Sequence, residues 1–146
     1  MDFSKIRETN TNDIQSLSFE DYTTLAKVIS VYDGDTVTLG FCIPNTDLIF
    51  KWKCRLLGID TPELRTKNEI EKKCATEARD ALKLKIPIGS IVKIRCGDFD
   101  KYGRILVRIF TINSDNIEIE CINDFLVNNK YAKEYDGGKK QEFAQN

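Results

Sequence analysis

Three short stretches of the chain combine the residue types that phosphate chemistry requires. They are Asp-Gly-Asp-Thr at 33–36, Arg55 followed by Asp-Thr-Pro-Glu at 60–63, and Asp-Lys-Tyr-Gly-Arg at 100–104. Carboxylate oxygens are hard ligands that suit Ca²⁺ or Mg²⁺, and an arginine fork matches two phosphate oxygens. If the fold brings these stretches together, they can bind a divalent cation and a phosphate group.

Each stretch also has a plainer interpretation when it is taken alone. An Asp-Gly pair between two β-branched runs is typical of a tight hairpin, because both residues tolerate positive φ. Residues 60–63 are compatible with a turn or a helix start, and 101–104 with a solvated hairpin tip. Arg55 and Asp60 lie five residues apart, so a regular strand would point them to opposite faces. They can share a site only if Asp60 already lies in the turn that the following proline favours.

The hydrophobic pattern predicts the elements that must position these residues. Extended segments are expected over 23–50, where Asp33-Gly34 separates two strands, and over 49–59, 91–96, 105–112 and 117–119. A charged segment at 67–85 predicts an amphipathic helix whose packed face recurs every four residues, at Ile70, Cys74, Ala78 and Leu82. A second short helix is expected over 123–127, with Phe125 and Leu126 inward, and the tail from Lys133 is expected to fray.

The order of three strands, a helix, two strands and a helix predicts an α+β fold that is mainly β. We expect a five-stranded OB-like Greek-key barrel with two to three helices. The 146 residues are enough for one domain with a core and too few for two ordinary ones. Residues 1–21 are polar and aperiodic, so we expect a flexible N-terminal extension followed by one folded domain over 22–146.

The composition limits the class of protein. The net charge is −1, whereas a protein that coats nucleic acid non-specifically shows a strong basic excess. Any phosphate binding must therefore come from a few placed cations, with or without a metal. No run approaches the roughly 18 apolar residues of a membrane span. The five cysteines are odd in number, and without histidine or a close cysteine pair they favour free buried thiols over zinc. The thiols and the absence of an apolar signal sequence favour an intracellular location.

The three stretches resemble the signature segments of the staphylococcal-nuclease (thermonuclease) family. The similar segments are 31–37, 54–63 and 100–104, and they occur in the family's order and at compatible spacing. The resemblance extends over residues 23 to 135. It implies an OB-like barrel that carries a calcium-dependent nuclease site.

The resemblance assigns roles to individual residues. Asp35 and Asp60 match the family's calcium-binding carboxylates, and the backbone carbonyl of Thr61 matches a further ligand. Asp33 matches an acidic neighbour of the metal that does not bind it directly. Glu63 matches the glutamate that acts as base on the attacking water.

Other matches concern the substrate. Arg55 and Arg104 match the two arginines that grip the scissile phosphate, and Lys101 and Tyr102 match residues that line the nucleotide pocket. The family's tyrosines near the C-terminal region align only loosely with Tyr131 and Tyr135. Tyr135 is assigned to the pocket, and Tyr131 can belong to the pocket or to the core. The near-neutral charge and the short tail depart from the family's secreted bacterial members.

The resemblance therefore implies a calcium-dependent endonuclease, acting as a monomer on DNA and RNA with little sequence preference. In-line attack of a metal-positioned water would break the P–O5′ bond and leave 3′-phosphorylated products. The alternative is a catalytically inactive barrel that binds nucleic acid or a peptide. Such relatives lose the glutamate, an arginine or the metal carboxylates, all of which are present here. A single-strand binder of the OB type would need more aromatic platforms than Trp52, Tyr102 and Tyr135.

Overall fold

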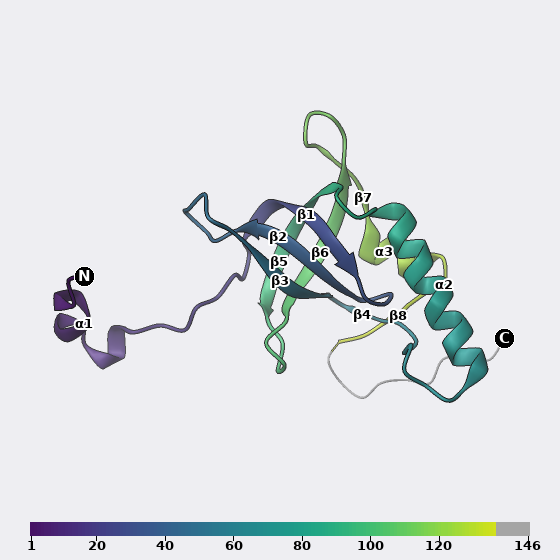
Figure 1. The fold of residues 1–146 in the computed structure, drawn as a ribbon, viewed down its shortest axis with the longest axis horizontal. Helices are drawn as coiled ribbons and strands as arrows, with labels where there is room; N and C mark the ends of the chain where they lie inside the picture. The colour runs from purple at the N-terminus through teal and green to yellow at the C-terminus, as the bar shows by residue number, and fades with distance from the viewer. Residues whose placement is uncertain (137–146) are drawn as a thin grey trace.

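A computed structural model of the chain describes residues 1–136, and five strands form a closed barrel. They are β1 (Thr23–Val31), β2 (Thr36–Cys42), β3 (Ile49–Leu56), β5 (Ile91–Phe99) and β6 (Ile105–Ile112). The strand order is β3-β2-β1-β5-β6, and β6 pairs in parallel with β3 to close the barrel (Figure 1). The short β7 (Glu118–Cys121) pairs with β6. The α+β, mainly β OB-like barrel predicted from the sequence is confirmed.

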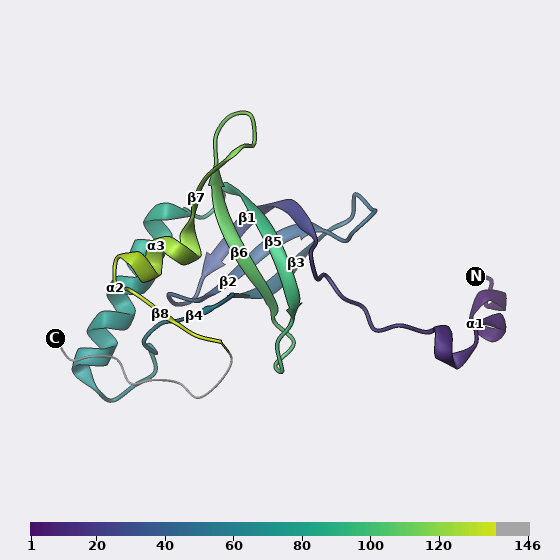
Figure 2. The same cartoon turned by 180° about the vertical axis from the view of Figure 1, so that it is seen from behind.

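The remaining elements gather beside the barrel, except at the N-terminus. Helices α2 (Glu69–Lys85) and α3 (Ile122–Asn128) lie next to each other on one side, as both views show (Figures 1 and 2). Strands β4 (Ile59–Asp60) and β8 (Lys133–Glu134) form a separate antiparallel pair. The short helix α1 (Ser4–Glu8) and the 3₁₀ turn η1 (Thr11–Asp13) lie in an arm that extends away from the barrel (Figure 1). No helix of the described chain is long and apolar enough to cross a membrane.

Helix α2 is defined by its caps and by a stripe of small and aliphatic residues. The Asn68 side chain accepts hydrogen bonds from the N–H groups of Ile70 and Glu71 and so caps the helix at its start. The buried residues are Ala75, Ala78 and Leu82. Their mixed three- and four-residue spacing follows the 3.6-residue period of a helix.

The packed face predicted for this helix is partly wrong. Ala78 and Leu82 are buried, but Cys74 is only half-buried and Ile70 is exposed. A strict four-residue repeat drifts by about 40° per step around an α-helix, so Ile70 is rotated by about 120° from Leu82. Because of this drift Ile70 lies outside the packed face, and Ala75 is buried on that face instead.

The arm is anchored by one residue that the sequence assigns to the extension. Phe19 is 1% exposed, and its ring centroid lies 5.1 Å from that of Trp52, 5.6 Å from Phe99 and 6.2 Å from Phe41. The aromatic cluster closes the barrel end from which the arm departs. The boundary of the packed domain therefore lies near Phe19, a few residues before β1.

The segment after α3 is ordered by contacts with the turn between β3 and β4. Ile59 pairs with Glu134 and Asp60 with Lys133, and the Tyr135 N–H donates to the Gly58 carbonyl. The expectation that the tail frays from Lys133 is therefore wrong for the first residues. Strand β8 has only two residues, which is too short for the alternating pattern that predicts a strand from sequence. The rest of that tail, 137–146, lies outside the described residues.

A buried asparagine joins α3 to the barrel. Asn123 is 1% exposed, its Nδ2 donates to the carbonyls of Leu57 and Val107, and its Oδ1 accepts the Ile109 N–H. These bonds join helix α3 to the backbone of the β3–β4 turn and of β6, and they satisfy the buried side chain of Asn123. All five cysteines are free, although only Cys54 and Cys96 are fully buried.

The anchoring role of Phe19 predicts a sharp difference between two changes. Phe19→Ala should lower the free energy of unfolding by about 3–5 kcal/mol, because it opens a cavity among packed rings. Deletion of residues 1–17 should leave the free energy of unfolding within about 0.5 kcal/mol of the full chain. Urea unfolding followed by Trp52 fluorescence measures both. A larger loss from the deletion than from Phe19→Ala would contradict this packing.

Candidate active site

The turn between β1 and β2 places the first acidic stretch against the rest of the site. Asp33 Oδ1 accepts the Asp35 N–H at 3.1 Å, and the Tyr32 N–H donates to the Thr36 carbonyl at 3.0 Å. A Cβ on Gly34 would lie 2.8 Å from Thr61 Cγ2 and 2.9 Å from the Cβ of Ala78. Only glycine permits this approach, so the turn packs directly against residue 61 and helix α2.

Arg55, near the end of β3, is the buried hub of the site. Its Nη1 donates to the carbonyls of Leu56 and Ile59 at 3.2 and 2.9 Å. Its Nη2 contacts Asp60 Oδ1 at 3.1 Å and Asp35 Oδ2 at 3.4 Å. The three side chains are 10% exposed or less, so water screens these ion pairs little.

The pairing of Arg55 with Asp60 depends on a two-residue turn at 57–58, between β3 and β4. Gly58 adopts φ +77°, in the left-handed region that glycine occupies without strain. This turn separates β3, which ends at Leu56, from β4, which starts at Ile59, and it brings Asp60 beside Arg55. The two residues therefore share a site as expected, but Asp60 lies in strand β4 and not in the turn that the following proline favours.

Asp35 joins three segments through its two carboxylate oxygens. Oδ2 accepts the backbone N–H of Thr61 at 3.1 Å in addition to its contact with Arg55. Oδ1 accepts the Thr36 hydroxyl at 3.1 Å. The Thr61 Oγ1 is buried and has no hydrogen-bond partner among the described residues.

A second arginine is positioned by its own hairpin between β5 and β6. Asp100 Oδ1 accepts the N–H groups of Tyr102 and Arg104 at 2.8 and 2.9 Å, and Oδ2 accepts Arg104 Nε at 2.7 Å. Partial burial acts to raise the pKa of Asp100, but these hydrogen bonds outweigh it and the pKa is lowered. The Arg104 guanidinium carbon also lies 5.4 Å from the centre of the Tyr102 ring. Asp100 is thus a positioning residue to which the sequence assigned no role.

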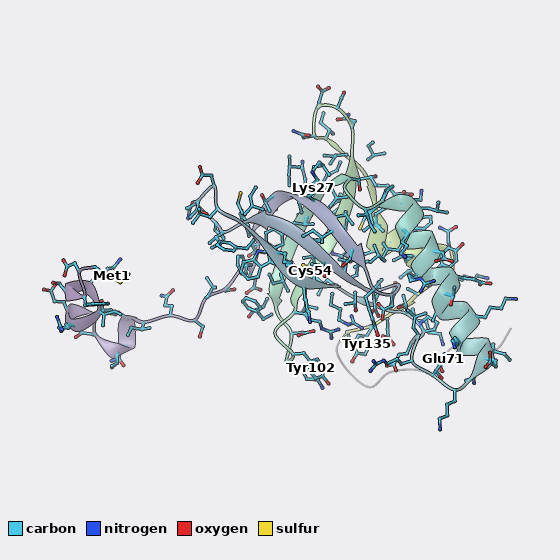
Figure 3. All side chains as sticks on the ribbon, in the orientation of Figure 1. Met1, Lys27, Cys54, Glu71, Tyr102 and Tyr135 are labelled. Carbon is cyan, nitrogen blue, oxygen red and sulfur yellow. The ribbon has the colours of Figure 1, made fainter. Side chains whose placement is uncertain are left out.

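One cavity of about 600 Å³ collects most of the predicted site residues. Eight of the ten line it: Asp33, Asp35, Arg55, Glu63, Lys101, Tyr102, Arg104 and Tyr135. Figure 3 shows Tyr102 on the β5–β6 hairpin and Tyr135 near the end of the described chain, on the same side of the barrel. Asp60 and Thr61 do not line this cavity. They lie behind it, at 4% and 2% exposure, in contact with Arg55 and Asp35.

The two C-terminal tyrosines have different environments. Tyr135 lines the cavity, and the Arg55 guanidinium carbon lies 5.4 Å from its ring centre. Tyr131 packs against the core and stacks on Phe125 at 6.2 Å. Tyr131 is therefore a core residue, which resolves the alternative that its loose alignment left open. The cavity also contains Arg65, a cation that carried no signal in the sequence beyond its charge.

Two neighbouring carboxylates, Asp33 and Asp35, line one part of the cavity. Burial, and next to it the charge of Asp35, raise the pKa of Asp33 to about 6. Arg55 already offsets Asp35 and Asp60, so a third carboxylate in the same place remains poorly compensated. A bound cation would relieve this crowding.

Comparison with known proteins agrees with this geometry. The family model for staphylococcal nuclease homologues matches residues 53–146. The chain belongs to this family. The uncharacterized protein MJ1439 of Methanocaldococcus jannaschii is 29% identical over an alignment of 147 positions, and the alignment covers 82% of this chain and 67% of that protein.

Membership of the staphylococcal nuclease homologues gives this domain a nuclease-like or nucleic-acid-binding character. The matched region begins within β3 and contains Arg55, Asp60, Glu63 and Arg104, but not the turn at 33–36. The fold itself supplies that turn, through the contacts of Asp35 with Arg55 and Thr61.

The residues present fit the calcium ion that the family implies. The carboxylates of Asp35 and Asp60 approach the same nitrogen of Arg55 from two segments, and Asp35 is bonded to the backbone of Thr61. Carboxylate and backbone carbonyl oxygens are the ligands that Ca²⁺ prefers. Within the described residues, no group of three or more His, Cys, Asp or Glu side chains is placed to hold a metal ion.

The raised pKa of Asp33 predicts a pH-dependent stability. Between about pH 4 and 6 the folded protein binds more protons at Asp33 than the unfolded chain does, so this residue lowers the free energy of unfolding as pH rises. Asp33→Asn retains the oxygen that accepts the Asp35 N–H and cannot ionise. In metal-free buffer, the variant should therefore gain stability relative to the native protein from pH 4 to pH 7. Urea unfolding at each pH measures this difference. An equal dependence of the free energy of unfolding on pH in the native protein and in Asp33→Asn would contradict the raised pKa of Asp33.

Proposed function

We propose that this domain is a calcium-dependent endonuclease that hydrolyses phosphodiester bonds of DNA and RNA with little sequence preference. The observation that supports the proposal is the cavity in which Arg55, Arg104 and Glu63 meet Asp35. Phosphodiester hydrolysis needs groups of these kinds: two guanidinium groups, a carboxylate that can act as a base and a carboxylate that can bind a cation. The same cavity contains side chains suited to hold a nucleotide.

Asp35, Asp60 and the Thr61 carbonyl would hold the cation. When bound, calcium supplies positive charge to a phosphate oxygen and orients the attacking water. Arg55 is fixed beside these groups by four hydrogen bonds, and its position does not depend on the substrate. Such preorganisation lowers the reorganisation that the reaction requires.

Arg55 and Arg104 bind the scissile phosphate in this proposal. Asp100 engages the Nε of Arg104, and the Nη groups of its fork can donate to phosphate oxygens. The charge on the phosphate oxygens grows as the attacking oxygen bonds to phosphorus, so both arginines stabilise the transition state more than the ground state. This difference accelerates the reaction.

Glu63 acts as the general base. It is exposed at the cavity, where it can accept a proton from a water molecule about 3 Å away. The water oxygen bonds to phosphorus as the opposite P–O5′ bond breaks, and the leaving 5′ oxygen takes a proton from solvent. The products carry a 3′-phosphate and a 5′-hydroxyl. The chain contains no histidine, and this sequence of steps uses none.

Lys101, Tyr102 and Tyr135 hold the nucleotide next to the scissile bond. Aromatic rings stack on any base, which is consistent with little sequence preference. Tyr102 is 71% exposed, and Lys101 Nζ lies 5.2 Å from the centre of its ring. A base stacked on Tyr102 would thus lie near two cations, Lys101 and Arg104.

The activity is tested by incubating denatured DNA with the protein and either Ca²⁺ or EGTA. We expect cleavage only with calcium, a loss of about 10²–10⁴-fold in kcat for Glu63→Gln, and a loss of about 10²–10³-fold for Arg104→Ala. Glu77→Gln, on the exposed face of α2, is the matched control and should retain full activity. Circular dichroism checks the fold of each variant. Absence of cleavage with every divalent metal would leave a nucleic-acid- or peptide-binding module instead.

Calcium binding is tested separately from catalysis. Asp35→Asn retains the shape of the side chain and removes one charge from the proposed cation ligands. Calorimetric titration should show calcium affinity at least tenfold weaker for this variant, because a carboxylate ligand is lost. Asp115→Asn, in an exposed turn between β6 and β7, should bind calcium as the native protein does. Equal affinities of the native protein and Asp35→Asn would remove Asp35 from the ligand set.

A further inference from the structure

A row of cations follows the outer face of β3 into the candidate active site. Lys51, Lys53 and Arg55 alternate with the inward residues Trp52 and Cys54, so the three cations share one face of the strand. Alternate residues of a strand lie about 6.6–6.8 Å apart, which extends the row roughly 13 Å from Arg55. Both lysines are exposed, whereas Arg55 is buried in the site. The row therefore runs from solvent to the residue proposed to hold the scissile phosphate.

The charge of this face is segregated from the rest of the chain. Strands β1, β2 and β3 contain three lysines and Arg55 and no Asp or Glu, although the whole chain has a net charge of −1. On the other side of the barrel, acidic residues of β7 neutralise basic neighbours, as in the Arg95–Glu118 pair at 3.1 Å. In residues 1–136, neither Lys51 nor Lys53 takes part in an ion pair. Their charge is therefore available to a ligand.

The neighbouring strand adds neutral groups to the same face. In the β2–β3 register Thr36 lies opposite Arg55, and Thr38 lies opposite Lys53. The Thr36 hydroxyl donates to Asp35 Oδ1, so the hydroxyl of Thr38 is the one that can donate to a phosphate oxygen without adding charge. Strands β2 and β3 lie on the side of the barrel that faces the viewer in Figure 1, with the β5–β6 hairpin beside them. Lys51, Lys53 and Arg55 thus form a positive strip that leads to the cavity, with the exposed Ile29 and Ile49 beside its outer end.

The width of the row and the residues at its end identify the class of ligand. The row is one side chain wide, which matches one phosphate backbone. The cavity at its end contains Tyr102 and Tyr135, and an aromatic side chain stacks on a base only when that base is not already stacked in a duplex. The corresponding face of OB folds commonly binds oligonucleotides. These features favour a single-stranded nucleic acid.

We propose that Lys51 and Lys53 bind the backbone phosphates of single-stranded DNA or RNA as it passes along β3 to the cavity. The inference rests on the proposed function for the position of the scissile phosphate at Arg55 and Arg104. It adds a binding surface outside the cleavage site, formed by Lys51 and Lys53 on β3.

Binding is measured by fluorescence anisotropy with a labelled 12-nucleotide single strand, in EGTA so that no cleavage occurs. The double variant Lys51→Gln/Lys53→Gln should raise Kd roughly tenfold and reduce the slope of log K against log salt by about 1.4, since each lost contact removes about 0.7. The charge-matched control Lys73→Gln/Lys83→Gln, at exposed positions of α2, should leave both quantities unchanged. Identical Kd and slope for the β3 variant and the native protein would overturn the proposal.

A second pair of variants tests the same face without removing a lysine. Thr38→Glu places a carboxylate opposite Lys53 and should weaken binding, whereas Thr38→Gln, of similar size, should not. Equal effects of the two variants would contradict an electrostatic role. A 12-base-pair duplex that binds as tightly as the single strand would overturn the preference for single strands.

Cleavage assays separate this inference from the proposed nuclease activity. If the protein cuts, the β3 double variant should raise KM for the 12-nucleotide strand, with unchanged kcat and unchanged turnover of a dinucleotide too short to reach Lys51. Lysine-dependent binding without cleavage in any metal would refute the nuclease and still support the β3 surface. Calcium-dependent cleavage with the same KM for the native protein and the β3 double variant would support the nuclease and overturn the proposed binding surface.

Discussion

The site depends on the burial of one guanidinium group between two carboxylates. Arg55 contacts Asp35 and Asp60 at 10% exposure or less, and a charge left there without its partners would cost several kcal/mol. The β1–β2 turn, the end of β3 and the start of β4 must therefore converge for the chain to fold. Gly34 and Gly58 make this possible, the first by close packing and the second by its positive φ. The arrangement that keeps the buried Arg55 paired is thus the one that assembles the candidate site.

The two arginines are held in different ways that suit different demands. Arg55 is buried and fixed by two carboxylates and two backbone carbonyls, whereas Arg104 is partly exposed and fixed by Asp100 within a hairpin. A buried arginine gives strong electrostatics in a poorly screened environment, and an exposed one allows a substrate to enter. Asp33 has no such arginine partner, and its pKa is raised to about 6, first by burial and then by the neighbouring charge of Asp35.

Local patterns predicted much of the fold, and long-range contacts account for what they missed. Strand β6 occupies the predicted residues 105–112. Its alternation of buried and half-buried side chains is a local pattern, so the sequence alone was enough to predict it. The sequence left the position of Asp60 open, because it depends on the backbone conformation of Gly58. The packing of Phe19, the hydrogen bonds of Asn123 and strand β8 were not predicted, since each depends on partners far away in the chain. The three motifs identified most of the site residues. The contact of Asp100 with Arg104 and the position of Arg65 in the cavity are visible only in the folded protein.

The most direct test of the account is a crystal structure with Ca²⁺ and a single-stranded oligonucleotide whose scissile linkage resists hydrolysis. We expect a calcium ion bound by Asp35, Asp60 and the Thr61 carbonyl, with one phosphate in contact with both Arg55 and Arg104. Calcium bound elsewhere on the domain, or a phosphate that contacts neither arginine, would contradict it.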